Sequence, residues 1–380
     1  MSPPAGRRSV PATASERFAI AVLPGDGIGH EVVPASIEVL SATAELSNLD
    51  LEFRYYEAGA DFYSRTGVAI TPEVMTEIGE ADAILLGAMG LPGIRYPDNT
   101  EIAPQIEIRE HYDLFASVRP ARMLPGVPPV LTGERGRTID FVVIREITEG
   151  LFAGRTAPDI AEDRASNVLT ITRGGAERVF DFAFELARQR KRQGFPGRVT
   201  LVDKANVLAA FAFMRRIFDE RRALYPDIQA DTAYIDAAAM WMILDPQRFD
   251  VVVTENQFGD ILSEVAAGIV GGLGLAPSAD IGASHAVFQP SHGTAPDIAG
   301  QGKANPIATI LSAAMMLDWL GERRESRACR AAAAVIRKGV DQALLGGLRP
   351  YDLGGRHGTR DVTRAIIDAL SRMASSETDA

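Results

Sequence analysis

Short apolar runs alternate with longer segments of helical periodicity along most of this chain, and this alternation limits the possible folds more than any other feature of the sequence. Runs rich in valine, isoleucine and leucine are typical of strands that are buried on both faces. The alternation indicates an α/β fold in which helices cover a mostly parallel sheet. We predict the strands at 18–23, 83–86, 141–144, 199–202 and 251–254.

Two segments between these runs place apolar residues at helical spacing, so each is predicted to form a helix with one face against the sheet. The predicted faces contain Val179, Phe182, Ala183 and Leu186 in one helix, and Val207, Phe211, Met214 and Phe218 in the other.

The length of 380 residues is about twice that of a typical domain, so two domains are expected. Two turn-rich stretches suggest where they join: residues 120–132 contain four prolines, and residues 271–278 read GGLGLAPS. We predict a flexible tail at 1–17, an outer nucleotide-binding domain formed by 18–114 and 271–380, and a middle domain at 115–270.

The composition argues against several classes of function. A net charge of −11 disfavours non-specific binding to nucleic acid or to anionic membranes. No apolar run reaches the roughly 18 residues that a membrane span needs, and the first 17 residues lack the apolar stretch of a secretory signal. The single cysteine, Cys329, excludes an intrachain disulfide, so a reducing cytoplasmic location is expected.

Three carboxylates suggest a metal site made of oxygen ligands. Asp260 and Glu264 are four residues apart in a predicted helix, so they share one face of it, and Asp236 follows another short apolar run. Oxygen ligands of this kind suit Mg²⁺ or Mn²⁺ better than Zn²⁺. A solvated acidic helix face is the alternative that the spacing alone leaves open.

Basic residues stand where an anionic substrate would bind. Arg145 directly follows a predicted strand, and Arg109 and Arg119 flank the apolar patch DLFASV. Guanidinium groups bind carboxylates through two parallel hydrogen bonds, so three of them suit a substrate with two carboxylates. Lys204 ends another predicted strand, where a lysine beside cationic groups can act as a base. Scattered surface cations are the alternative.

Two glycine-rich loops are candidates for nucleotide binding. The motif Gly25–Gly29 follows the first strand, but it is not GxGxxG, because His30 follows Gly29. A Rossmann fingerprint is therefore absent, and a tight strand-to-helix turn is the alternative. The loop 289–306 is rich in glycine, proline and polar residues and offers Asp297 to ribose hydroxyls.

Seven motifs in order make the chain resemble the isocitrate/isopropylmalate dehydrogenase family of β-decarboxylating dehydrogenases. The resemblance covers about residues 18–370 and implies two α/β domains with a cleft between them and a non-Rossmann nucleotide site. The motifs are LPGDGIGHE (23–31), DLFASVRPAR (113–122), VVIREITEGLFAG (142–154), VDKANVL (202–208), YIDAAAM (234–240), TENQFGDILSE (254–264) and HGTAPDIAGQGKANP (292–306).

The resemblance also implies roles for these residues. Arg109, Arg119 and Arg145 would bind the carboxylates of a small dicarboxylic 2-hydroxy acid. Lys204 and Asp236 would reach across a homodimer interface in the middle domain, with Lys204 as the base and Asp236 completing the Mg²⁺ or Mn²⁺ site of Asp260 and Glu264. The cofactor-binding residues would be Ile28, His292, Gly293, Thr294, Ala295, Asp297, Ile298 and Asn305.

The cofactor is expected to be NAD. Enzymes of the family that use NADP carry a lysine and a tyrosine where this chain has Asp297 and Ile298. A carboxylate there accepts a hydrogen bond from the ribose 2′-hydroxyl and repels a 2′-phosphate. The reaction implied is NAD-linked oxidation of the hydroxy acid followed by loss of CO₂.

Three residues depart from the family pattern. Phe152 stands where a tyrosine usually gives the final proton, and phenylalanine has no donor. Glu264 replaces an aspartate in the metal cluster, which moves the carboxylate by about 1 Å, one added methylene. His30 replaces a common proline. Phe152 and Glu264 keep a catalytically weak regulatory paralogue as an alternative to an active dehydrogenase.

The substrate is expected to be a malate with a modest substituent. Gln105 and Ile106 stand where isopropylmalate dehydrogenases have a leucine pair, and Ala103 stands where isocitrate dehydrogenases have a serine. No arginine is expected near the substituent to bind a third carboxylate. We rank 3-isopropylmalate or another 3-alkylmalate first, tartrate or D-malate second, and isocitrate third.

Overall fold

A computed structural model describes residues 15–133, 136, 138–155 and 159–378. The strands are β1 (Glu16–Gly25), β2 (Leu49–Tyr55), β3 (Ala83–Ala88), β4 (Ala116–Arg122), β5 (Asp140–Glu146), β6 (Asp159–Ile160), β7 (Ala165–Ser166), β8 (Arg198–Asp203), β9 (Gln229–Tyr234), β10 (Val251–Thr254), β11 (Pro277–Ile281) and β12 (Ala286–Pro290). The helices are α1 (Gly29–Ser47), α2 (Ala60–Thr66), α3 (Pro72–Gly79), α4 (Pro104–His111), α5 (Arg173–Arg192), α6 (Ala209–Arg222), α7 (Ile235–Leu244), α8 (Asn256–Ile269), α9 (Ile307–Arg323), α10 (Arg327–Leu345) and α11 (Thr359–Thr378).

All five predicted strands are confirmed, with ends that differ by two residues or fewer. The predicted tail ends too late, because β1 already begins at Glu16, and residues 1–14 lie outside the described residues. In the described part of the chain, no helix is long and apolar enough to cross a membrane.

The main sheet has ten strands in the order β2-β1-β3-β12-β11-β4-β5-β10-β8-β9. Its pairs are parallel except at the centre, where β11 runs antiparallel to both β12 and β4, and β4 runs antiparallel to β5. This confirms an α/β fold with a mostly parallel sheet. The predicted domain boundary falls between β11 and β4, but one sheet continues through both halves, so the division stays a prediction.

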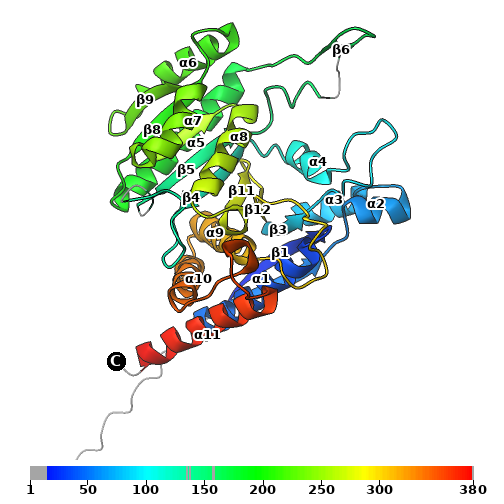
Figure 1. Ribbon diagram of the computed structural model, residues 1–380, viewed down its shortest axis with the longest axis vertical. Coiled ribbons are helices and arrows are strands. Elements are labelled where there is room, and N and C mark those ends of the chain that lie inside the picture. Colours follow the sequence, from blue (N-terminus) through cyan, green and yellow to red (C-terminus); the bar gives the residue numbers. More distant parts are fainter. Residues whose placement is uncertain (1–14, 134–135, 137, 156–158, 379–380) are drawn as a thin grey trace, which may run out of the picture.

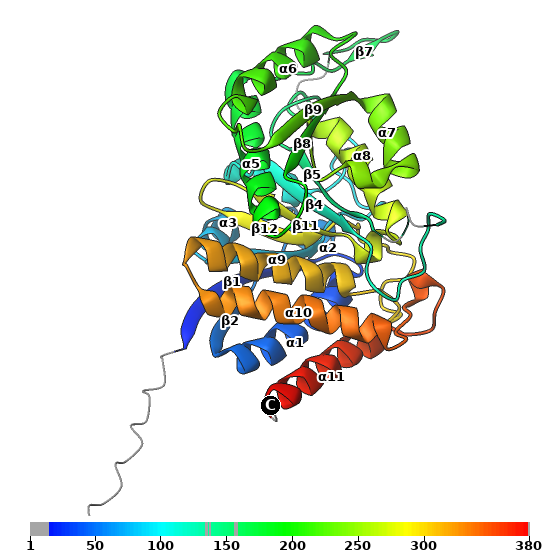
Figure 2. The same ribbon diagram turned by 90° about the vertical axis from the view of Figure 1, so that its left-hand side faces the viewer.

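The upper half of the molecule in Figure 1 contains β5, β8, β9 and β10. Successive residues of these strands face opposite layers of helices. Val142 and Ile144 pack in the same cluster as the buried residues of α5 and α6, whereas Phe141 and Val143 pack with α7 and α8. Figure 2 shows these two helix pairs on opposite sides of the strands. The valine-rich runs are apolar throughout because both of their faces are buried.

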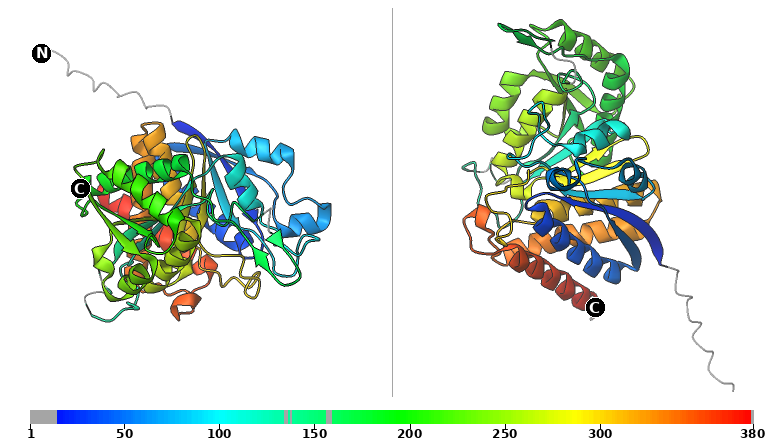
Figure 3. Two further views of the ribbon diagram at one scale, coloured as in Figure 1. Left: turned by 90° about the horizontal axis from the view of Figure 1, so that it is seen from above. Right: turned by 90° about the vertical axis from the view of Figure 1, so that its right-hand side faces the viewer.

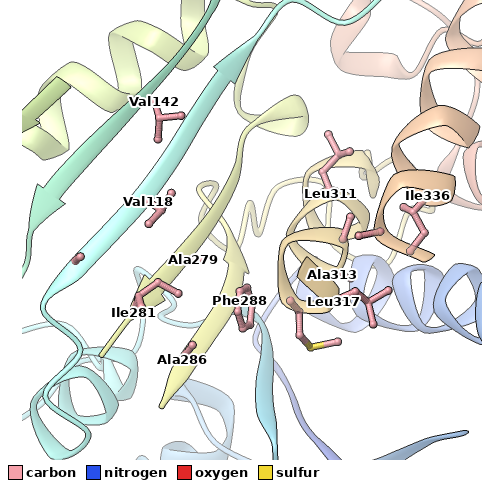
Figure 4. Packing of buried hydrophobic residues seen from close by; sticks show 14 of the residues in the cluster. Val118, Val142, Ala279, Ile281, Ala286, Phe288, Leu311, Ala313, Leu317 and Ile336 are labelled. Atoms are coloured by element: carbon pink, nitrogen blue, oxygen red, sulfur yellow. The ribbon is translucent and has the colours of Figure 1, made fainter. Parts of the chain in front are cut away.

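In the lower half, α1, α9, α10 and α11 cover one face of the sheet (Figure 1). Phe288 of β12 faces α9, and Leu317 of α9 lies toward Ile336 of α10 (Figure 4). The first and last helices, α1 and α11, lie side by side (Figure 3). The other face of β1 and β3 is covered by smaller helices that include α3 and α4.

The two predicted helix faces need correction. Val179 and Ala183 are buried, and Phe182 and Leu186 pack against the same core but are only partly buried, because α5 is rotated so that Phe180 lies deeper. In the second helix, Phe211, Met214 and Phe218 are buried as predicted. Val207 is 69% exposed, because α6 begins only at Ala209.

The antiparallel centre reverses the direction of the sheet. Strands β5, β8, β9 and β10 all run the same way, so their carboxyl ends share one edge. Arg145, Lys204 and Asp236 lie at or just beyond those ends. In the other half, the loops after β1, β3 and β12 likewise share an edge, and these contain the two glycine-rich segments.

Candidate functional site

The three predicted arginines come from α4, β4 and β5 and lie close enough to one another to interact electrostatically. Figure 1 shows α4 and β4 near the place where the two halves of the molecule meet. Strand pairing sets Arg145 of β5 opposite Ser117 of β4, and Asp280 of β11 opposite the same serine. Arg109 reaches this point from α4, and its Nε donates to Oδ2 of Asp280 at 2.7 Å. The fold thus brings together residues that are far apart in the sequence.

Arg119 and Arg145 are almost completely buried, with 8% and 3% of their surfaces exposed. Arg145 donates from Nε and Nη2 to Oδ1 of Asn256, at 3.0 and 2.7 Å, and its Nη1 pairs with Asp260. Arg119 donates from Nη1 to Oγ of Ser263 at 2.9 Å. Both guanidiniums are therefore held from α8.

The surroundings of these arginines favour an added anion. Burial, then the neighbouring guanidinium of Arg119, lowers the pKa of Arg145 to about 9, and burial lowers the pKa of Arg119. For Asp280, burial alone would raise the pKa, but Arg109, Ser117 and Arg119 hold it below the usual range. A carboxylated ligand would relieve the repulsion among the guanidiniums.

Two of the three predicted metal ligands lie beside this cluster. Asp260 and Glu264 are one turn apart on α8, and each has an oxygen within 4 Å of Arg119 Nη1, at 3.7 and 3.9 Å. Both side chains are about half exposed. Burial raises the pKa of Glu264, and Arg119 opposes this. Two open carboxylates on one helix face fit Mg²⁺ or Mn²⁺.

The third predicted ligand lies elsewhere in the chain. Asp236 accepts from Nζ of Lys204 at 2.6 Å, and this hydrogen bond lowers the pKa of Asp236. Among the described residues, no three acidic, histidine or cysteine side chains are placed to hold a metal. Lys204 follows β8, which is two strands from β5 and so about 10 Å away along the sheet. The contribution of Lys204 and Asp236 to a partner's site stays a prediction.

A small recess opens beside the arginines. The ring of Phe152 lies under the guanidinium of Arg145, 5.1 Å from its carbon, and Ile106 lines the same recess. Gln105 does not line it, and its Oε1 is buried without a hydrogen-bond partner among the described residues. The full lining is Ile106, Arg109, Glu110, Ile147, Thr148, Phe152, Ala153, Arg155 and Asn256.

No arginine was expected near the substituent, and this stays a prediction, but one arginine does lie beside the recess. Arg155 lines the recess and pairs with Glu110 through Nη1 and Oε1 at 2.6 Å. The two residues are 45 positions apart, and no spacing signal linked them. Asn256, Ser263 and Asp280 were also missed, although the first two stand in the same motif as Asp260 and Glu264.

The predicted nucleotide loop folds back onto the first glycine motif. The N–H of Ile28 donates to the carbonyl of Thr294 at 2.9 Å. Ile28 is buried against Ala295 and Ile298, with Val32 and Ala304 completing the cluster. Ala295 and Ile298, which are only partly buried and rest on these residues, offer an apolar surface suited to the flat face of a base.

Polar groups of this loop also suit a nucleotide. Burial lowers the pKa of His292, so its ring is neutral at pH 7, and its Nε2 is buried without a partner in the described part of the chain. Asp297 is exposed. Asn305 is already engaged, because its Nδ2 donates to Asp352 and its Oδ1 accepts from the N–H of Ile307. Gly293, the next residue after His292, is exposed.

Comparison with known proteins places these features in a family. A model described as isocitrate/isopropylmalate dehydrogenase matches residues 19–370. A 3-isopropylmalate/3-methylmalate dehydrogenase of Methanocaldococcus jannaschii is 45% identical over 91% of this chain and 97% of its own length. A 3-isopropylmalate dehydrogenase of Methanothermobacter thermautotrophicus is 41% identical over 92% of this chain and 98% of its own. The crystal structure of an isocitrate dehydrogenase from Methylococcus capsulatus superposes with a TM-score of 0.81, at 34% identity, over 93% of this chain and 99% of its own.

Proposed function

The chain belongs to the isocitrate/isopropylmalate dehydrogenase family, and on that basis we propose that it catalyses the NAD-linked oxidative decarboxylation of a 3-substituted malate, with 3-isopropylmalate or another 3-alkylmalate as substrate. The observation that carries the proposal is the cluster of three guanidiniums beside Asp260 and Glu264. Arg109 of this cluster also lines the neighbouring recess, whose walls are partly apolar.

The charges of the cluster suit a dianion together with a divalent cation. Arg109, Arg119 and Arg145 carry three positive charges, and Asp260, Glu264 and Asp280 carry three negative ones, so their formal sum is zero. A divalent cation adds two positive charges, which the two carboxylates of a malate would balance. The guanidiniums offer the fork geometry that binds carboxylates.

The recess supports an alkyl group at C3 of the substrate. Ile106, Ile147 and Phe152 give it apolar walls. At the polar side of the recess, the guanidinium of Arg155 is already paired with the carboxylate of Glu110. A third carboxylate would have to displace Glu110, which ranks a 3-alkylmalate above isocitrate.

The chemistry follows from the placement of these groups. When bound, a divalent cation would polarise the substrate hydroxyl, and NAD would accept the hydride from C2. The arginines hold the two carboxylates and so fix C2 relative to the nicotinamide. Lys204 of a second copy of the chain, reaching across the proposed dimer interface, takes the hydroxyl proton, directly or through water. The β-keto acid then loses CO₂, and water or Lys204 protonates C3, because Phe152 has no donor.

NAD is the proposed cofactor because of the loop 291–305. The neutral His292 and the apolar surface of Ala295 and Ile298 suit the adenine ring. The exposed carboxylate of Asp297 suits a free ribose 2′-hydroxyl and opposes a 2′-phosphate.

A homodimer supplies what one chain lacks. Asp236 and Lys204 pair with each other and lie away from the carboxylates of α8 in the same chain. We propose that they complete the site formed by those carboxylates in the other chain. The neighbouring helices α7 and α8 carry large apolar side chains that are about half exposed, which is typical of a surface covered by another chain. These side chains are Met240, Ile243, Leu244 and Ile261.

The proposal is tested with the purified chain, Mn²⁺ and NAD against 3-isopropylmalate, 3-methylmalate, D-malate, tartrate and isocitrate, with NADH followed by absorbance and the products identified by mass. We expect turnover that EDTA abolishes, highest with a 3-alkylmalate. Highest turnover with D-malate or tartrate would favour that second substrate class. Absence of turnover with every member of the panel would favour a regulatory paralogue, the alternative that Phe152 and Glu264 support.

A further inference from the structure

One buried carboxylate near the nucleotide loop has no part in the site described above. Asp26, in the first glycine motif, is 1% exposed. Its Oδ2 accepts from the N–H groups of Ala60 and Gly90, and its Oδ1 accepts from that of Asp61, all at 2.8 Å. Its own N–H donates to the carbonyl of Ala88 at 2.6 Å. A single side chain therefore joins the ends of β1 and β3 to the beginning of α2.

These contacts continue to the nucleotide loop. The carbonyl of Gly90 accepts from Oγ1 of Thr294 at 2.7 Å, and the carbonyl of Thr294 accepts from the N–H of Ile28 at 2.9 Å. Thr294 is 6% exposed. It is thus held from two sides, by Gly90, which Asp26 binds directly, and by Ile28, which is two residues beyond Asp26 in the chain.

Close packing leaves little freedom around these groups. A Cβ at Gly27, where φ is +55°, would lie 2.2 Å from the carbonyl oxygen of Thr294. A Cβ at Gly59, where φ is +125°, would lie 2.5 Å from Oδ2 of Asp26. Both glycines are needed for the carboxylate and the threonine to approach the backbone this closely.

We propose that Asp26 is a positioning residue for the nucleotide loop. By fixing Gly90 and the turn that carries Ile28, it sets the place of Thr294 and hence of Ala295 and Ile298, which form the apolar surface offered to the base. The inference rests on the proposed function in one respect, the assignment of this loop to NAD. Asp26 itself is buried and would act only through these backbone hydrogen bonds.

The first test is Asp26→Asn, in the full-length protein. An amide has one accepting oxygen and one NH₂ group, so at least one of the three backbone N–H groups loses its acceptor. We expect the Kd for NADH, measured by fluorescence without substrate, and the KM for NAD to rise roughly tenfold, the effect of losing one hydrogen bond to a charged group. The KM for the hydroxy acid and kcat should change less than about twofold.

Two comparisons separate positioning from general stability. Asp250 is also buried and also accepts from two backbone N–H groups, those of Gly197 and Arg198, but it lies in the other half of the sheet. Asp250→Asn should lower the Tm without changing the Kd for NADH. Thr294→Val keeps the side-chain shape and removes only the hydroxyl that donates to the carbonyl of Gly90. It should weaken NADH binding, and it keeps the proposal testable even if Asp26→Asn does not fold.

Hydrogen exchange gives a measurement that needs no cofactor. In the unliganded protein, Asp26→Asn or Thr294→Val should raise exchange in peptides covering 291–301, and Asp250→Asn should not. The proposal is overturned if Thr294→Val leaves both this exchange and the Kd for NADH unchanged, or if Asp26→Asn affects only the Tm. If the wild-type chain binds no NADH, the assignment of the loop fails and the proposal fails with it.

Discussion

Replacing Arg145 by lysine separates the geometry of a buried guanidinium from its charge. Arg145 is 3% exposed, and its Nε and Nη2 share Oδ1 of Asn256 at 3.0 and 2.7 Å. A lysine keeps the charge on a flexible stem but cannot reproduce this fork or a two-bond contact with a carboxylate. Arg145→Lys should therefore weaken binding of the hydroxy acid through lost geometry alone.

The expected size follows from the hydrogen bond that a lysine would no longer donate to the substrate carboxylate. One hydrogen bond between charged groups contributes about 1.5–3 kcal/mol, and 1.4 kcal/mol corresponds to a factor of ten. We therefore expect kcat/KM for the hydroxy acid to fall roughly 10- to 150-fold. The KM for NAD should change less than about twofold, because the nucleotide loop lies in the other half of the molecule.

The assay is initial-rate NADH formation at saturating NAD and Mn²⁺ with varied hydroxy acid. Arg122→Lys is the matched control, because Arg122 makes a two-bond contact with Asp341, at 3.1 and 2.7 Å, away from the recess. It should retain wild-type kcat/KM. The reasoning is refuted if Arg145→Lys stays within threefold of wild type, or if Arg122→Lys loses as much.

Three further predictions follow from the site. Phe152→Tyr restores a proton donor beside Arg145 and should raise the ratio of decarboxylated product to β-keto acid, by up to about 100-fold; mass analysis of the products measures it, and an unchanged ratio would show that Phe152 does not limit this step. Asp297→Lys replaces a carboxylate that repels the 2′-phosphate of NADP by an ammonium that attracts it. The kcat/KM with NADP, divided by the kcat/KM with NAD, should therefore rise at least about tenfold, and steady-state rates with both cofactors decide this. Ile243→Glu puts a charge on the apolar face of α7 and should weaken the dimer roughly 10- to 100-fold; sedimentation velocity checks it, and an intact dimer at low concentration would count against that face as the interface.

The parallel strands inside the two edges, β1, β3, β5, β8 and β10, could be predicted because burial on both faces leaves an unbroken apolar run. The edge strands β2 and β9, which read LDLEFRY and QADTAY, were missed because they are only partly buried and carry polar residues. The antiparallel centre could not be predicted either. Strand β11 reads PSADI, in which a proline, a serine and an aspartate hide the pattern. Asp280 is 1% exposed there, and one of the groups that make its burial possible is Arg109, 171 residues away, which donates to it at 2.7 Å. A contact at that sequence separation leaves no local signal.

The site shows the same division. Asp260 and Glu264 could be placed together from the sequence, since a four-residue spacing on a helix is a local property. Their proximity to Arg119 and Arg145 is a property of strand order, which periodicity does not encode. The Arg155–Glu110 pair in the recess was missed for this reason, and the phase of α5 was misjudged because Phe180 and Phe182 are both apolar and lie on different faces.

Asp260 connects the arginines to the proposed cation. Arg145 pairs with Asp260, and Arg119 lies 3.7 Å from it. Without ligands, this carboxylate therefore holds two guanidiniums, and a bound cation would compete with them for it. A cation on Asp260 and Glu264 repels these guanidiniums and leaves them free for the carboxylates of the substrate. Mn²⁺ and the hydroxy acid should therefore each bind more tightly in the presence of the other, by the same factor of roughly 5- to 150-fold. Calorimetry without NAD measures both affinities, and Asp260→Asn should remove the coupling. Equal substrate affinity with and without Mn²⁺ would mean that Asp260 does not restrain the arginines.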